Sequence, residues 1–188
     1  MQKTIKTFSK GFSLVETLVA VSILSLVIAG TLTAVQKGIQ SSIYAKNQIF
    51  AFYLAQEGME FIKNIRDENA LNSVSGGSKK WLTGLSNISS DPCYFGKTCT
   101  IDSNIGIQNG GVAACSGGFG TCPNLRQDPA SGLLGYTSTW TITNFKREIQ
   151  FQSISANEVS VVISISWISG AVNRSFQIQE TLFNRQGL

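Results

Sequence analysis

The chain has 188 residues, a formal net charge of +4 and no histidine. This length suits one domain together with an anchor. The missing histidine excludes that side chain as a catalytic base, a proton shuttle or a metal ligand. The modest net charge does not indicate a nucleic-acid-binding protein.

The first predicted element is a long apolar helix that follows a basic N-terminal segment. Residues 1–11 carry three lysines and no acid, whereas the 24-residue segment 12–35 has Glu16 as its single ionisable side chain. A helix of this length rises about 36 Å, enough to cross a bilayer core of about 30 Å. The basic flank predicts that the N-terminus stays in the cytoplasm and that the rest of the chain points outward.

The junction between these segments carries the most specific motif of the sequence. The apolar run is longer than the ~7–15 residues of a secretory-signal core, and no small-x-small cleavage site closes it. Instead, Gly11 precedes the run and Glu16 follows Phe12 by four positions. Together with the basic leader and the uncharged span, this arrangement resembles the type III signal of type IV prepilins and pseudopilins.

The resemblance implies a processing step and a role for one acid. A prepilin peptidase that is also a methylase would cut between Gly11 and Phe12 and N-methylate Phe12. Residues 1–11 would then be a cleaved leader, residues 12–35 the filament core, and Glu16 an assembly residue. The alternative is an ordinary single-span anchor with an isolated acid. A carboxylate at membrane depth costs a few kcal/mol, however, and usually has a partner.

Residues 36–70 predict an amphipathic second half of the same helix. The helix is expected to continue without a proline and to stop between Asn69 and Ser73. Apolar side chains recur at four- and seven-residue steps, namely Ile39, Ile43, Phe50, Leu54, Phe61 and Ile65. Such a stripe needs an apolar partner, and we expect this half of the helix to pack against its own domain.

Residues 71–138 form a glycine-rich region in which we expect one short strand, at about Lys97–Asp102, and turns elsewhere. It contains all four cysteines, namely Cys93, Cys99, Cys115 and Cys122. Their spacing is wider than that of zinc-ligand pairs, and they lie on the outward side of the predicted span, so we expect disulfides rather than zinc. Three pairings are possible. The favoured one joins Cys93 to Cys99 and Cys115 to Cys122, because each pair is close in sequence.

Residues 139–188 predict an antiparallel β-meander. It comprises three runs with short links, Thr139–Phe151, Glu158–Ile168 and Asn173–Phe183. In the middle run, apolar side chains from Val159 to Trp167 alternate with a face rich in serine, which is typical of a half-buried strand. One long helix followed by a terminal sheet predicts an α+β fold with the helix packed across the sheet. That is also the pilin fold, so the resemblance extends beyond the N-terminus.

These features favour a structural filament subunit over an enzyme. The carboxylates Asp91, Asp102 and Asp128 could serve an enzyme, but they lie in glycine-rich loops without a patterned partner, and we expect no cofactor or metal. Many major pilins carry a cysteine pair after the last strand, and major pseudopilins a C-terminal calcium loop. This sequence has neither, so we expect a minor pilin or pseudopilin of a type IV pilus or type II secretion-like filament.

The resemblance also implies partners and a location. The partners are the prepilin peptidase, other pilin subunits, a membrane assembly platform and the cytoplasmic membrane. The location is a single-pass cytoplasmic membrane protein that moves into an extracellular pilus or a periplasmic pseudopilus. Contact with nucleic acid stays open for the basic pairs Lys79-Lys80 and Lys146-Arg147 if the filament is a competence pilus. The alternative function is a membrane-anchored extracytoplasmic ligand-binding or sensor module.

Overall fold

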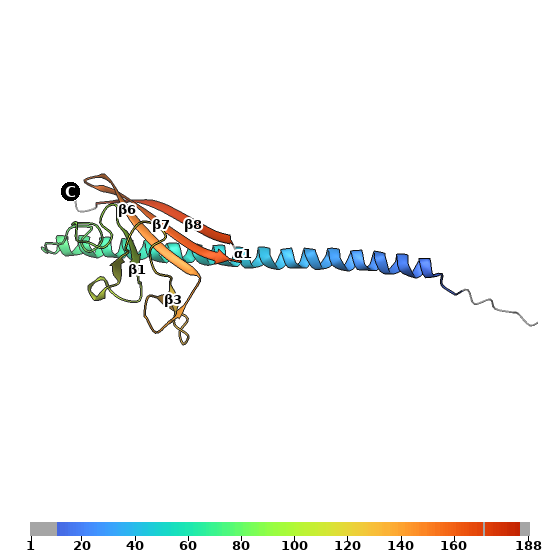
Figure 1. Cartoon of the computed structure of the whole chain (residues 1–188). Helices are drawn as coiled ribbons and strands as arrows, with labels where there is room; N and C mark the ends of the chain where they lie inside the picture. The colour runs from blue at the N-terminus through green and yellow to red at the C-terminus, as the bar shows by residue number, and fades with distance from the viewer. Residues whose placement is uncertain (1–10, 171, 185–188) are drawn as a thin grey trace, which may run out of the picture. The chain divides into compact units, whose positions relative to one another are not determined.

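The computed structural model describes residues 11–170 and 172–184 (Figure 1). The backbone divides into two compact units, residues 1–45 and residues 46–188. Of the predicted leader, residues 1–10 lie outside the described residues.

Helix α1 runs from Leu14 to Val74 and contributes to both units. It ends where Gly76 adopts a φ of +85°, a left-handed conformation that glycine takes without steric cost. The Gly77 N–H closes this end by donating to the Asn72 carbonyl over 2.8 Å. The helix therefore continues slightly beyond its predicted end, because the first left-handed residue is Gly76.

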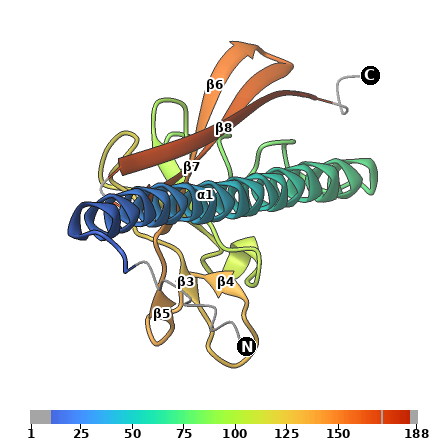
Figure 2. The same ribbon diagram turned by 90° about the vertical axis from the view of Figure 1, so that its right-hand side faces the viewer.

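The second unit contains a five-stranded antiparallel sheet in the order β2-β1-β6-β7-β8. The strands are β1 (Thr98–Ile101), β2 (Val112–Ala114), β6 (Phe145–Ser155), β7 (Glu158–Ser169) and β8 (Val172–Phe183). The three long strands lie on one side of α1 (Figures 1 and 2). This arrangement confirms the predicted α+β class and the terminal antiparallel meander.

A second, smaller sheet lies on the other side of α1 (Figure 2). Its order is β4-β3-β5, with β3 at Arg126–Gln127, β4 at Leu134–Gly135 and β5 at Thr141–Ile142. A short 3₁₀ helix, η1, spans Ile107–Asn109. The expectation of one strand and otherwise turns in the glycine-rich region is therefore wrong, because β2, β3 and β4 also form there.

The predicted run Thr139–Phe151 is also wrong as one strand, because β5 and β6 belong to different sheets. Leu125 separates them: its carbonyl accepts from the Thr143 N–H over 2.9 Å, and its own N–H donates to the Phe145 carbonyl over 2.8 Å. The backbone at residue 143 is thus paired with Leu125, which places residues 141–142 beside β3.

The core of the second unit lies between α1 and the large sheet. The buried α1 residues of this core comprise Ala51, Leu54, Ala55, Gly58, Met59, Ile62 and Ile65. Asn69 is also buried, but its side chain donates to the carbonyls of Trp81 and Thr83. The facing strand β7 buries its predicted apolar set, namely Val159, Val161, Ile163, Ile165 and Trp167. This packing confirms the alternation read from the sequence.

The predicted apolar stripe of α1 is correct in its last part and wrong in its first. Leu54 and Ile65 are buried and the Phe50 ring lies 4.9 Å from the ring of Phe145 on β6, whereas Ile39 is 55 % exposed and Ile43 is 49 % exposed. The buried face instead follows small residues such as Ala51 and Gly58, which let the helix backbone approach the sheet closely. Counting only large apolar side chains missed these positions.

Candidate processing and assembly site

The predicted cleavage site lies in exposed, non-helical chain. Gly11, Phe12 and Ser13 precede α1, and the Phe12 side chain is 80 % exposed. Ser13 caps the helix: its hydroxyl accepts from the Val15 N–H over 3.3 Å, and its carbonyl accepts from the Thr17 N–H over 3.1 Å. The Gly11–Phe12 bond therefore lies just outside the first helical turn.

Glu16 lies in that first turn and is exposed. The unpaired N–H groups of a helix N-terminus favour a carboxylate at this position. Five hydroxyl groups of the following apolar segment bond to carbonyls of the preceding turn at 2.8–2.9 Å, namely those of Thr17, Ser22, Ser25, Thr31 and Thr33. Because these hydroxyl groups are already bonded within the helix, Glu16 is the one ionisable group on the otherwise apolar segment 12–35.

The apolar part of α1 is long and hydrophobic enough to cross a membrane by length and composition. Its best 18-residue window has a mean hydropathy of 2.4, and none of that window is buried. Every residue from Gly11 to Ala45 is exposed. An apolar helix without burial needs either lipid or the helices of other subunits around it.

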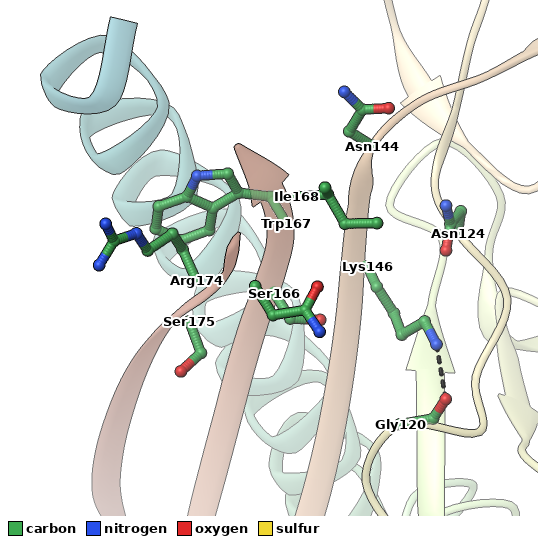
Figure 3. Close-up of a pocket in the computed structure, with 10 residues that line it drawn as sticks. Gly120, Asn124, Asn144, Lys146, Ser166, Trp167, Ile168, Arg174 and Ser175 are labelled. Atoms are coloured by element: carbon green, nitrogen blue, oxygen red, sulfur yellow. Dashed lines mark hydrogen bonds between the residues drawn. The ribbon is translucent and has the colours of Figure 1, made fainter. Parts of the chain in front are cut away.

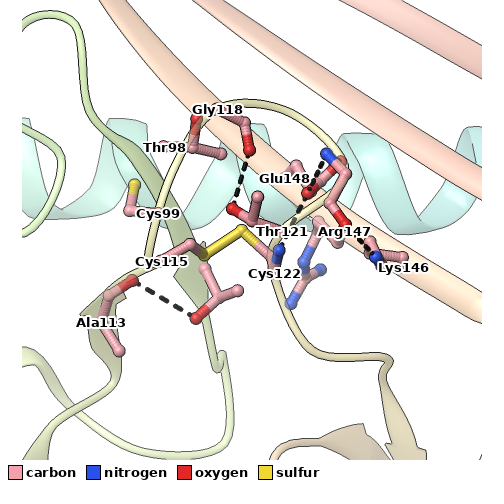
Figure 4. The surroundings of a disulfide bond; sticks show 12 residues. Thr98, Cys99, Ala113, Cys115, Gly118, Thr121, Cys122, Lys146, Arg147 and Glu148 are labelled. Atoms are coloured by element: carbon pink, nitrogen blue, oxygen red, sulfur yellow. Dashed lines mark hydrogen bonds between the residues drawn. A yellow bond between two sulfur atoms is a disulfide. The ribbon is translucent and has the colours of Figure 1, made fainter.

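The cysteines form two disulfides between sequence neighbours, Cys93–Cys99 and Cys115–Cys122. Cys99 lies in β1 itself, so the first disulfide joins a turn to the large sheet. The second closes a loop that lies on the face of β6 opposite α1 (Figure 4). This is the pairing that the sequence favoured.

Two side chains of β6 hold the Cys115–Cys122 loop. The Glu148 carboxylate accepts from the Gly120 N–H over 2.7 Å and from the Cys122 N–H over 3.1 Å. The Lys146 ammonium donates to the Gly120 carbonyl over 2.6 Å (Figure 3). Side chains of β6 thus bind both the N–H and the carbonyl group of Gly120 in this loop.

The basic pair Lys146-Arg147, considered above for contact with nucleic acid, does not present two cations at the surface. Arg147 is fully buried and lies on the core face of β6. Its guanidinium donates to the Leu54 carbonyl over 3.1 Å and to the Ile101 carbonyl over 2.6 Å. It also pairs with the Glu57 carboxylate over 3.2 Å. Sequence reasoning missed this role, although an arginine between Phe145 and Ile149 on an apolar strand face was a usable signal.

The three loop carboxylates that could serve an enzyme instead stabilise turns. Asp91 accepts from the Asn87 and Ile88 N–H groups over 2.6 Å and 3.0 Å. Asp102 accepts from Asn104 over 2.9 Å and from the Tyr136 N–H over 2.8 Å, which ties its turn to the segment after β4.

Asp128 is the third of these carboxylates, and it accepts from the Ser131 hydroxyl over 2.6 Å. This bond lowers the pKa of Asp128. Asp91 and Asp102 are buried. Within residues 11–170 and 172–184, no three potential metal ligands of the Asp, Glu and Cys types gather to hold an ion.

One polar pocket lies beside the β7–β8 turn, on the face of the large sheet that carries Lys146 (Figure 3). It has a volume of about 390 Å³. Lys146, Ser166 and Ser175 lie opposite one another on β6, β7 and β8 along one side of it. Its lining contains no carboxylate and no cysteine, so it offers hydrogen-bond donors to a small polar ligand but no paired acid and base.

Comparison with known protein families gives a match at the N-terminus. Residues 7–32 match the family model of the prokaryotic N-terminal methylation motif. Searches of curated proteins and of solved structures gave no significant match. The matched segment contains Gly11, Phe12 and Glu16 and the first half of the exposed apolar helix. The chain therefore carries the N-terminal signature of a type IV pilin-like prepilin protein.

Proposed function

We propose that the chain is a structural subunit, a minor pilin or pseudopilin, of a type IV pilus or a type II secretion-like filament. The observation that carries this proposal is the methylation motif on residues 7–32, which overlaps the apolar part of α1, where the best 18-residue window has no buried residue. Residues 1–11 are the leader, residues 12–35 the filament core and residues 36–70 the outer half-helix. Residues 71–138 are the disulfide-containing region, and residues 139–188 the terminal sheet region.

In this proposal the subunit is first a single-pass protein of the cytoplasmic membrane, with its N-terminus inside. A prepilin peptidase cuts between Gly11 and Phe12 and methylates Phe12. An assembly platform then moves the subunit into a pilus outside the cell or a pseudopilus in the cell envelope, where its partners are other pilin subunits. Glu16 would guide that step, because the new amino group on Phe12 is a cation that can approach the carboxylate of a neighbouring subunit.

The electrostatics of this pair set the size of the expected effect. Two unit charges 4 Å apart attract by about 4 kcal/mol at an effective dielectric constant of about 20, against about 1 kcal/mol in water. Desolvation offsets part of this, so the pair acts mainly on register and recruitment. An unpaired carboxylate in hydrocarbon is the unfavourable alternative, and assembly relieves it.

The first test is processing of the N-terminus. Intact-mass measurement of the mature protein should give a chain that begins at Phe12 and carries one added methyl group. Retention of Met1 would contradict the proposal. It would favour the alternative of a membrane-anchored ligand-binding module, for which the polar pocket beside Lys146 is the candidate site.

The second test is assembly. Glu16→Ala should leave membrane insertion and cleavage intact and lower the amount of subunit in sheared filaments by about tenfold or more. Thr17→Ala is the matched control, since it changes the neighbouring residue of the same turn and removes only an internal hydrogen bond. Wild-type amounts of the Glu16→Ala protein in filaments would show that Glu16 is an incidental acid in an ordinary anchor.

A further inference from the structure

Within the part of the chain that the structure describes, strand β8 is a long edge of the large sheet. It has 12 residues and pairs with β7 in a register that continues from Glu158↔Phe183 to Ser169↔Val172 without a shift. Among the described residues, β7 is the only strand that pairs with it. Natural sheet edges are usually protected by proline, bulges or several charges. β8 has no proline and carries two charged side chains, Arg174 and Glu180.

The two faces of β8 differ in character. Arg174, Phe176, Ile178 and Glu180 alternate onto the face that looks toward α1. On that face the Phe176 ring lies 6.0 Å from the ring of Phe52, and Glu180 pairs with Lys63 over 2.9 Å. The opposite face carries the exposed polar side chains Asn173, Ser175, Gln177 and Gln179, followed by the half-buried Thr181 and the exposed Phe183 at the end of the strand.

We propose that β8 is a self-pairing edge, and that its occupant is β8 of a second copy of this chain. The two strands would run antiparallel about a two-fold axis through Gln177. Residues 172–182 of each copy then overlap. Arg174 of each copy lies opposite Glu180 of the other, and Phe176 lies opposite Ile178. On the α1-facing side each dimer therefore contains two cross-strand ion pairs and four apolar pairs, two of Phe176 with Ile178 and two of Val172 with Leu182.

No neighbouring register offers the same complementarity. A shift by one residue would place the apolar face of one copy beside the polar face of the other. A shift by two residues would place Arg174 opposite Ile178 or Leu182 and separate both ion pairs. The charges and the apolar side chains thus select one register, and this register is centred within half a residue of the middle of the strand.

The two-fold symmetry of this contact also determines the relative direction of the two copies. Antiparallel pairing reverses the direction of α1 residues 46–74 between the two copies. The contact therefore joins subunits that point in opposite directions, such as those carried by two filaments lying side by side. It differs from a contact between neighbours within one filament, and it does not depend on the proposed assembly role of Glu16.

The test uses the full-length protein in detergent and measures dimerisation by sedimentation at rising protein concentration. Arg174→Glu and Glu180→Arg should each weaken the dimer by roughly fivefold or more, because two ion pairs are replaced by like charges. The double swap Arg174→Glu/Glu180→Arg should dimerise more tightly than Glu180→Arg alone, because it re-forms both cross-strand ion pairs. The comparison is matched, since both variants lack the Glu180–Lys63 bond. A double swap that dimerises no better than the single variants would overturn the inference.

A cysteine experiment tests the register without relying on ion pairs. All four native cysteines are in disulfides, so an introduced thiol is the sole free one. Gln177→Cys lies on the proposed axis and should form an intermolecular disulfide on mild oxidation. Ser175→Cys is the control on the same face, and it should cross-link several-fold less, because it lies opposite residue 179 of the other copy.

Two outcomes would overturn the inference, namely equal cross-linking of the two cysteine variants and a wild-type protein that stays monomeric at about 100 µM. The amount of the same variants in sheared filaments is measured as well, because it tests the proposed function independently of the β8 contact. Absence of self-pairing together with normal incorporation would refute the β8 contact alone. Self-pairing that persists when Glu16→Ala is incorporated normally would refute the assembly role alone.

Discussion

Replacing either partner of the Arg147–Glu57 ion pair is predicted to lower the stability of the protein, but by unequal amounts. Arg147 is 0 % exposed, whereas the Glu57 side chain is 40 % exposed. Replacing Glu57 by alanine leaves a buried guanidinium without its counter-charge. Replacing Arg147 by methionine removes the buried charge and leaves a carboxylate that water can reach. We therefore expect that losing the exposed acid destabilises the protein more than losing the buried base.

The magnitude follows from the 3.2 Å separation of the charged atoms. Coulomb attraction at that distance is about 5 kcal/mol at an effective dielectric constant of 20 and about 1 kcal/mol in water. Because Glu57 is partly exposed, the value lies between these limits, and we expect Glu57→Ala to lower the free energy of unfolding by about 2–3 kcal/mol. Arg147→Met should cost about 1 kcal/mol, since the lost hydrogen bonds are offset by the removed desolvation penalty.

The assay is urea unfolding of the full-length protein in detergent, followed by tryptophan fluorescence. Trp81 and Trp167 are buried, so their emission reports the second unit. Glu60→Ala is the matched control, because Glu60 lies on the same helix and pairs with Lys63 at the surface. That change should cost less than about 0.5 kcal/mol. A greater loss for Arg147→Met than for Glu57→Ala would refute the reasoning and show that the guanidinium acts mainly through its hydrogen bonds.

Three further predictions concern the second unit. Burial raises the pKa of Tyr136 to about 12 from an ordinary value of 10.0, so unfolding releases a proton in this interval. Stability should be complete below pH 10 and fall by about 2–3 kcal/mol as the pH rises toward 12, and Tyr136→Phe should remove this part of the alkaline loss. Gly58→Val should cost about 1–3 kcal/mol in urea unfolding, because even a Cβ atom there would lie 3.3 Å from Ile163; Gly38→Val has open space and should cost less. Glu148→Gln leaves one acceptor for the Gly120 and Cys122 N–H groups, and it should speed reduction of the Cys115–Cys122 disulfide several-fold, as measured by thiol trapping.

The parts of the fold that sequence predicted well are those governed by regular apolar periodicity. The alternation from Val159 to Trp167 fixed both the strand and its buried face, because a period of two has one geometric meaning. The apolar run from Phe12 likewise predicted a helix. The buried face of the outer half of α1 was predicted less accurately, because it includes the small residues Ala51, Ala55 and Gly58. Small residues carry little hydrophobic signal, although they decide how near two backbones can lie.

The sequence predicted the residues of the N-terminal motif but not their structural arrangement. Gly11, Phe12 and Glu16 drew attention because a basic leader, a glycine and a lone acid precede a long apolar run. The structure adds that Ser13 caps the helix and that the Gly11–Phe12 bond is outside it. Their roles in cleavage, methylation and assembly stay predictions, because each of them requires a partner that acts on the segment.

The glycine-rich region could not be predicted because its order comes from single polar side chains that meet backbone groups far away in sequence. Glu148 bonds to N–H groups of the Cys115–Cys122 loop, Asp102 to the Tyr136 N–H, and Arg147 to the Ile101 carbonyl. Irregular segments have few ladder partners, so buried N–H and carbonyl groups there must find side chains instead. Periodicity indicates which positions are buried but not which backbone group a buried charge will meet. A charged residue on the apolar face of a strand, such as Arg147, therefore marks a neighbouring element whose backbone needs a partner, even though the sequence does not say which one.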